Sequence, residues 1–152
     1  MTEISFRDAT AGDLPEIVRL LADDALGAQR ERYADPLPTA YRDAFAAIQA
    51  QVGNRILLAE MDGRIAGCAQ LTLIPGLSHI GTMRAQIESV RIGSGLRGHG
   101  IGEKLIRRCI ALAREAGCGL VQLTTDNSRA DARRFYERLG FTGSHLGMKL
   151  KL

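Results

Sequence analysis

A glycine-rich turn is the stretch of this sequence whose residue types are best suited to holding a ligand. It reads Arg97-Gly98-His99-Gly100-Ile101-Gly102 and lies between an expected strand and a long expected helix. The first amides of a helix have no intrahelical partner and carry partial positive charge. Glycine permits positive φ and close backbone approach to a ligand, and Arg97 adds a full positive charge. Together these features predict a seat for phosphate oxygens, and a pyrophosphate would suit it.

Two common phosphate-binding motifs do not fit this turn. A dinucleotide-binding motif requires G-x-G-x-x-G after the first strand of a βαβ unit, with an acidic residue about 20 positions later. Here the glycines are spaced G-x-G-x-G and lie past the middle of the chain. A P-loop requires Gly-Lys followed by Ser or Thr, whereas Gly102 precedes Glu103 and Lys104. From the turn alone, a phosphate site and a glycine-rich turn that only begins a helix both stay open.

The elements that must position this turn are predicted from hydrophobic periodicity. Apolar alternation predicts five strands, at residues 3–7, 55–61, 64–74, 85–92 and 120–124. Residues 141–152 are expected to add one or two more strands. Apolar residues at helical spacing predict four helices, at residues 14–21, 40–51, 100–116 and 128–139. Residues 29–38 and 75–83 are expected to be loops.

Local signals support these elements and their order. Asp62-Gly63, between two strands, predicts a tight hairpin. Thr10 and Asp13 have the spacing of a capping box at the first helix. The order of strand, two helices, three strands, helix, strand, helix and final strands predicts an α/β fold of the α+β type. We expect a mixed central sheet of six to seven strands with about four helices on its faces.

The bulk composition restricts the classes of function. The 152 residues suit one domain, residues 1–152. The net charge of +3 comes from basic residues that are spread along the chain, so no nucleic-acid partner is expected. No apolar run reaches about 18 residues and no signal peptide is visible, so we expect a cytoplasmic protein without a membrane partner. Three cysteines without CxxC spacing and three unpaired histidines predict no metal site.

Two motifs in order resemble the GNAT superfamily of N-acetyltransferases. The family's [Q/R]-x-x-G-x-[G/A] signature is matched by Arg97, Gly100 and Gly102. Its second signature, a helix that ends in Phe-Tyr-x-x-Leu-Gly-Phe, is matched by residues 135–141. The opening Phe6-Arg7-x-Ala9-x-x-x-Asp13-Leu14 is also similar to the family's first strand and helix, so the resemblance spans nearly the whole chain.

The resemblance implies a GNAT-type fold in which the fourth and fifth strands diverge and acetyl-CoA lies between them. Backbone groups of Val90, Arg91 and Ile92 would then pair with the pantetheine amides. The pyrophosphate would be held by the turn, with its residues Arg97, Gly98, His99, Gly100, Ile101, Gly102 and Glu103. In the family pattern N-x-x-A, the alanine is Ala132, but Arg129 stands at the Asn position and Asn127 lies two residues early. Ala132 and Asn127 complete the expected cofactor contacts.

The chemistry of acetyl transfer to an amine requires a base and a weak acid. An alkyl amine has a pKa near 10, so about 0.1% is neutral at pH 7, and the leaving thiolate departs better when protonated. Glu88, a carboxylate within an apolar strand just before the cofactor stretch, is the expected base. The resemblance places the Tyr136 hydroxyl near the thioester sulfur, as the acid. Alternatively, Glu88 faces solvent or pairs with Arg84 or Arg91, and Tyr136 is a buried aromatic.

We therefore expect an acetyl-CoA-dependent N-acetyltransferase that acts on a primary amine of a small molecule by direct attack. Two alternatives stay open: an N-acetyltransferase of proteins or peptides, and a non-catalytic acyl-CoA-binding module. The resemblance allows a homodimer. It also places the acceptor pocket among variable loops, here about residues 25–40, 75–85 and 142–147, and their sequence does not identify the acceptor.

Overall fold

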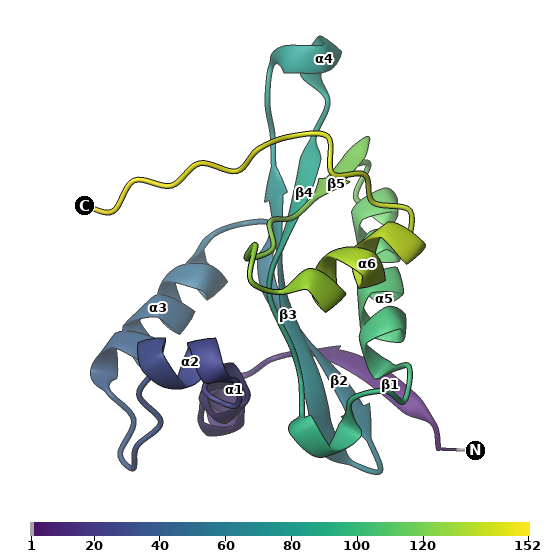
Figure 1. Ribbon diagram of the computed structural model, residues 1–152. Helices are drawn as coiled ribbons and strands as arrows, with labels where there is room; N and C mark the ends of the chain where they lie inside the picture. Colours follow the sequence, from purple (N-terminus) through teal and green to yellow (C-terminus); the bar gives the residue numbers. More distant parts are fainter. Residues whose placement is uncertain (1) are drawn as a thin grey trace.

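The computed structural model describes residues 2–152 and has a five-stranded mixed sheet, with strands in the order β1-β2-β3-β4-β5 (Figure 1). The first four strands are antiparallel neighbours, and β5 joins β4 in parallel. The strands are β1 Ile4–Asp8, β2 Asn54–Met61, β3 Arg64–Ile74, β4 Arg84–Ile92 and β5 Leu120–Gln122.

Helices cover both faces of this sheet. In Figure 1, α1, α2 and α3 lie on one side of the sheet, and α5 and α6 lie on the other. The α-helices are α1 Leu14–Leu21, α2 Ala25–Arg30, α3 Thr39–Ala50, α4 Ser78–Gly81, α5 Ile101–Glu115 and α6 Ala130–Arg138. Two short 3₁₀ helices, η1 Ala11–Asp13 and η2 Ser94–Leu96, precede α1 and α5.

The core is divided by the sheet into two layers. On the α5 side, Leu105, Ile106 and Cys109 are fully buried and pack with strand residues such as Leu71 and Ile87. On the α1 side, a smaller cluster joins Ile17 and Leu20 to Leu58 and Cys68. Burial of apolar area on both faces is the main stabilising contribution to this layered arrangement. It also makes the sheet a rigid support for the loops at its edges.

Two local predictions are confirmed in detail. Asp62 and Gly63 have φ of 51° and 72°, as a two-residue hairpin with positive φ at both central positions requires. The Thr10 amide donates to the Asp13 carboxylate (2.8 Å) in a capping box that begins η1. Arg7 makes two further hydrogen bonds to that carboxylate, at 2.7 and 2.9 Å, and so ties β1 to the start of α1.

The predicted numbers of strands and helices are wrong. The described residues form five strands rather than six to seven, and six α-helices rather than about four. The expected strands in 141–152 are absent, because this stretch leaves the body of the protein and meets no sheet edge. The prediction missed α2 and α4, which are only 6 and 4 residues long, too short to show an apolar periodicity.

Candidate functional site

A bulge in β4 opens the sheet beside β5. Gln70 of β3 lies opposite Glu88, but Cys68 lies opposite Arg91, so β4 has one extra residue between these pairs. Ser89 takes a φ of 54° there, a conformation that non-glycine residues rarely adopt. A bulge bends its strand and increases the local twist. The bulge in β4 therefore changes the direction of the backbone at the residues that are expected to bind pantetheine.

The edge of β4 next to this bulge has no strand partner. β5 pairs only with residues 84–86 of β4, through residues 120–122. Within residues 2–152, the β4 edge that faces away from β3 is therefore unpaired from residue 87 to residue 92. Strand backbone groups that are not paired are available to an extended ligand. Val90, Arg91 and Ile92 lie in this stretch, where the sequence predicts them to contact the cofactor.

The glycine-rich turn leads directly from this open edge to the N-terminus of α5. Gly98 and Gly100 have φ of 82° and 78°, and no atom lies within 4 Å of a Cβ built on either residue. Gly100 caps α5 without a side-chain hydrogen bond. The amides of the first helical turn, at Ile101, Gly102 and Glu103, thus keep their donors free for an anion. Backbone conformation, rather than lack of space, requires glycine in this turn.

Two side chains of the turn are held by backbone carbonyls. Arg97 Nε donates to the Ile92 carbonyl (3.2 Å), and the guanidinium lies 3.9 Å from Asp23. His99 Nδ1 lies 3.1 Å from the Arg97 carbonyl oxygen and 3.2 Å from that of Leu96. Both side chains are exposed, so they can reorient toward a phosphate group.

Tyr136 lies on α6 among aromatic side chains. Its ring meets Phe135 edge to face at 5.1 Å between ring centroids, and Phe141 at 5.8 Å. Burial raises the pKa of Tyr136, although Arg91 and Arg129 act in the opposite direction. A raised pKa keeps the phenol protonated at neutral pH. Tyr136 therefore has the protonation state that a proton donor requires.

Glu88 is an exposed carboxylate on β4, next to the bulge. It makes no ion pair with Arg84 or Arg91, and no other cation of the described residues lies within 4 Å of it. Its neighbour Ser89 lines an apolar cavity of about 160 Å³ between the sheet and helices α1 and α3. Glu88 itself is exposed and does not line this cavity.

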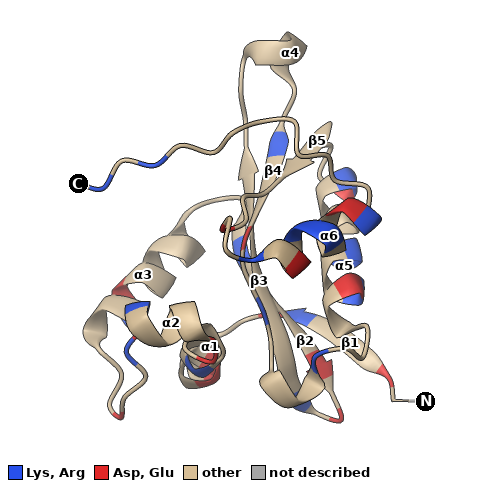
Figure 2. Ribbon diagram, in the orientation of Figure 1, with Lys and Arg blue, Asp and Glu red and all other residues tan. Residues whose placement is uncertain are grey.

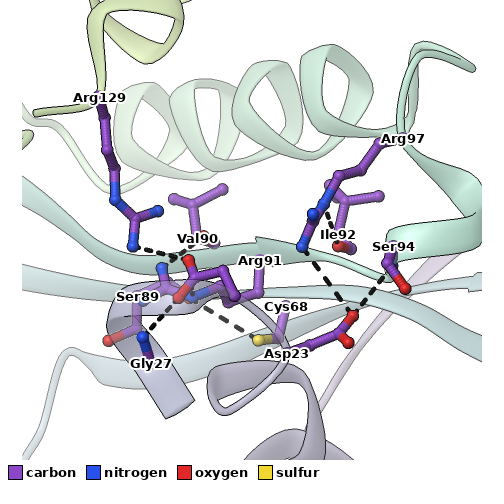
Figure 3. Close-up of polar contacts among 11 residues, drawn as sticks. Asp23, Gly27, Cys68, Ser89, Val90, Arg91, Ile92, Ser94, Arg97 and Arg129 are labelled. Carbon is purple, nitrogen blue, oxygen red and sulfur yellow. Dashed lines mark hydrogen bonds and ion pairs between the residues drawn. The ribbon is translucent and has the colours of Figure 1, made fainter. Parts of the chain in front are cut away.

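A cluster of charged residues connects the helices to the bulge in β4 (Figure 3). The sequence did not predict this cluster. Asp24 accepts a hydrogen bond from Arg129 Nη2 at 2.6 Å, and its carboxylate lies 3.6 Å from Arg91 Nε. It also accepts from the Gly27 amide at 2.5 Å and so caps α2. Its neighbour Asp23 accepts from the Ser94 amide (3.0 Å).

The pKa directions in this cluster follow from burial and charge. Burial would raise the pKa of Asp24, but the Gly27 amide and the two guanidinium groups lower it. Burial lowers the pKa of Arg91, assisted by the positive charges of Arg129 and Arg30 and opposed by Asp24. The Nε of Arg91 is buried and has no hydrogen-bond partner in the described chain. Two guanidinium groups share one carboxylate, which leaves positive charge uncompensated.

This cluster was detectable only in part from sequence. Asp24-x-x-Gly27 has the spacing of an N-cap, and that signal could have revealed α2. The pairing of Asp24 with Arg129 joins residues 105 positions apart, for which no local pattern exists. Arg129 occupies the position where the family pattern has Asn, and its side chain reaches across to α2. Asn127 is exposed and Ala132 half-buried, on either side of Arg129.

No cluster of metal-ligating side chains occurs in the part of the chain that the structure describes. None of the helices formed by residues 2–152 is long and apolar enough to cross a membrane.

Comparison with known proteins relates this geometry to a family. The model of the "Acetyltransferase (GNAT) family" matches residues 16–141. The chain is 34% identical over 106 residues to the aminoalkylphosphonate N-acetyltransferase of Salmonella typhimurium, covering 70% of this chain and 68% of that protein. It is 32% identical over 104 residues to the glucosamine 6-phosphate N-acetyltransferase of Trypanosoma brucei brucei, covering 68% and 69%.

Among solved structures, one crystal structure superposes over nearly the whole chain. It is described as a transcriptional regulator from Bacillus halodurans C-125 and has a TM-score of 0.96 and 47% sequence identity. The match covers 99% of this chain and 100% of that one. The fold therefore recurs in a protein that shares almost half of its residues with this chain.

Proposed function

The chain belongs to the acetyltransferase (GNAT) family and is an N-acetyltransferase, and from this premise we propose that it transfers the acetyl group of acetyl-CoA to a primary amine of a small molecule. Residues 1–152 act as one catalytic domain in this proposal. The observation that carries it is the unpaired β4 edge, which leads through η2 and the glycine-rich turn to the N-terminus of α5, where Gly100 supplies no side-chain cap. An extended amide chain that ends in a pyrophosphate fits this succession of sites.

In the proposed reaction, the amine attacks the thioester directly. Glu88, itself or through a water molecule, takes a proton from the ammonium group so that the nitrogen lone pair becomes available. The nitrogen bonds to the carbonyl carbon, and a backbone amide near Val90 stabilises the oxyanion. The carbon–sulfur bond then breaks, and Tyr136 Oη protonates the departing thiolate of coenzyme A. The nitrogen loses its second proton, which restores the Tyr136 phenol, and Glu88 releases the first proton to solvent, so that the amide product is neutral.

The test is the release of free thiol from acetyl-CoA with a panel of amines, amino acids, amino sugars and short peptides. Tyr136→Phe should lower kcat roughly 100-fold, while the Kd for acetyl-CoA changes less than about twofold. Glu88→Gln should shift the pH profile of the activity to higher pH, toward the pKa of the free amine, near 10. Glu115→Gln, an exposed carboxylate of α5 outside the site, is the matched control. Turnover that survives Tyr136→Phe, or an unchanged pH profile in Glu88→Gln, would remove the assigned role.

The panel also separates the two other interpretations. Tight acetyl-CoA binding without turnover on any amine would identify an acyl-CoA-binding module. Acetylation of peptides at the expense of small amines would identify a protein N-acetyltransferase. Small acceptors are favoured because both curated relatives reported above are named for them.

The acceptor is proposed to carry an acidic group. Arg91 and Arg129 share only Asp24, Arg30 adds to the positive field, and Arg91 Nε, an ion pair of Asp24 at 3.6 Å, has no hydrogen-bond partner in the described chain. The same two arginines influence Tyr136, so this charge lies near the proposed reaction centre. Guanidinium groups bind phosphonate, phosphate and carboxylate oxygens well. The two curated relatives are named for a phosphonate and a phosphate bound to an amine.

A comparison of matched amines tests this acceptor class. An aminoalkylphosphonate should have a KM at least tenfold below that of an alkylamine of the same length without the phosphonate. Arg129→Gln should raise the KM of the phosphonate and leave that of the neutral amine. Arg133→Gln, which removes an exposed guanidinium from α6, the helix that follows Arg129, is the control. Equal KM values for the two amines would refute the acidic acceptor.

The charge distribution gives less support to a nucleic-acid ligand, although one related structure is described as a transcriptional regulator. Figure 2 shows both signs of charge on α5 and α6. Several of these charges form pairs along one helix, as Arg107 with Glu103 and Arg133 with Glu137. A mixed surface of this kind suits a small anion better than a phosphate backbone.

A further inference from the structure

The apolar cavity between the sheet and helices α1 and α3 has the size of a small hydrocarbon group. Its volume is about 160 Å³, and the helices contribute aliphatic and aromatic side chains to its lining: Leu14, Ile17, Val18, Leu21, Phe45 and Ile48. Ala44 and Ser89 also line it and are exposed, so the cavity opens at the surface. A cavity of about 150 Å³ lined by Leu, Ile and Phe stays dry and binds benzene. This cavity can therefore hold an apolar group of about four to six carbon atoms.

The polar groups at the margin of the cavity already have partners. Gln70 lines it, and its amide donates to the Asn54 side chain at 3.1 Å. The Tyr41 hydroxyl donates to Glu31 at 3.1 Å and accepts from the Arg32 amide at 2.9 Å. A buried water molecule needs two to four polar partners, and a buried charge needs a counter-charge. The cavity therefore favours an apolar occupant over water or a charged group.

The cavity lies on the face of the sheet from which Glu88 projects. Residues directly opposite each other in an antiparallel pair have their side chains on the same face. Gln70, a lining residue, lies opposite Glu88 in the register of β3 with β4. Glu88 does not line the cavity, but it occupies the strand position beside a residue that does. The proposed base is thus a neighbour of the cavity.

The bulge in β4 brings Arg91 to the same face. Glu88 and Arg91 are three positions apart, so in a regular strand they would point to opposite faces. The extra residue of the bulge changes this, because Arg91 lies opposite Cys68, which lines the cavity. Figure 3 shows Cys68 beside the bulge, where its thiol donates to the Ser89 carbonyl at 3.7 Å. Base, guanidinium and apolar cavity therefore share one face.

We propose that the cavity binds an apolar side chain of the acceptor, carried by the same carbon as the amine and the acidic group. The amine then lies at Glu88, the acidic group at Arg91 and Arg129, and the apolar group in the cavity. The acceptor class is an α-amino acid, or the phosphonic acid of the same skeleton, with a side chain of about four to six carbon atoms. This inference rests on the proposed acetyl transfer, which it makes specific.

A series of amino acids with side chains of increasing length is the first test. Each methylene group that enters the cavity should raise kcat/KM about fourfold, so alanine and norleucine should differ roughly 60-fold. Tryptophan, whose ring system is larger than the cavity, should fall below norleucine. The Kd values of alanine and norleucine, measured by calorimetry with coenzyme A bound, should follow the same order and need no turnover. Equal Kd values for the two would overturn the inference, even if other amines were acetylated.

Variants that fill the cavity supply the second test. Ala44→Leu adds bulk at its opening, and Val18→Leu adds a carbon at a side chain that is 1% exposed. Each should raise the Kd of norleucine roughly fourfold or more and leave that of alanine within about twofold. Ala46→Leu is the matched control, because it is exposed and lies about 200° from Ala44 around α3. Unchanged selectivity in both filled variants, with intact circular dichroism, would refute the assignment of the cavity.

Discussion

Replacement of Asp24 by Asn tests how much the charged cluster contributes to the folded state. Asn caps helices about as well as Asp, so the cap of α2 should survive and only the negative charge is lost. Arg91 has a side chain that is 13% exposed and Arg129 one that is 30% exposed. Removing a partner from a buried ion pair costs about 3–5 kcal/mol, and from an exposed pair about 0–1 kcal/mol. For this intermediate burial we expect a loss of about 2 kcal/mol.

The assay is urea-induced unfolding, with thermal unfolding as a second measurement. A loss of about 2 kcal/mol corresponds to a Tm lower by roughly 4–8 °C in a chain of this size. Glu137→Gln, which removes the exposed pair with Arg133, should change stability by less than about 0.5 kcal/mol. Asp24→Ala should cost about 1 kcal/mol more than Asp24→Asn, because it also removes the helix cap.

The decisive outcome is how the free energy of unfolding of the two proteins depends on pH. The pKa of Asp24 is lowered in the folded protein, so its contribution is complete above the unfolded value of about 4 and is lost as the pH falls through the folded pKa. The stability difference between the wild type and Asp24→Asn should therefore shrink in that acidic window. A difference below about 0.5 kcal/mol at pH 7, or one that stays constant down to the acid transition, would refute the electrostatic explanation.

Two further predictions concern cysteine reactivity and the glycine-rich turn. Burial raises the pKa of the Cys68 and Cys109 thiols to about 12. A maleimide at pH 7 should therefore label only Cys118 in the folded protein and all three cysteines in urea, as counted by mass spectrometry. Rapid labelling of all three cysteines in the native state would contradict this burial. Gly100→Ala should cost about 1–2 kcal/mol, because its φ is 78°, and should weaken acetyl-CoA binding at least tenfold by calorimetry; unchanged affinity would remove the turn from the cofactor site.

Several features of the fold could be predicted because they depend on neighbouring residues. The Asp62-Gly63 hairpin and the capping box of Thr10 and Asp13 follow from backbone preferences within two to four residues. The long helix α5 follows from its apolar periodicity, since one face must pack against the sheet. The same reasoning failed for residues 141–152, where alternation predicts a strand but only an available partner edge can complete one.

By itself, the sequence determined the family, the glycine-rich turn and the identity of Glu88 and Tyr136 as candidates, because motifs and periodicities are properties of contiguous residues. Only the tertiary structure decided that β4 bulges at Ser89, and that Asp24 brings Arg91 and Arg129 together. These contacts join segments up to 105 residues apart. Their energies depend on burial and distance in space, which exist only after the chain has folded.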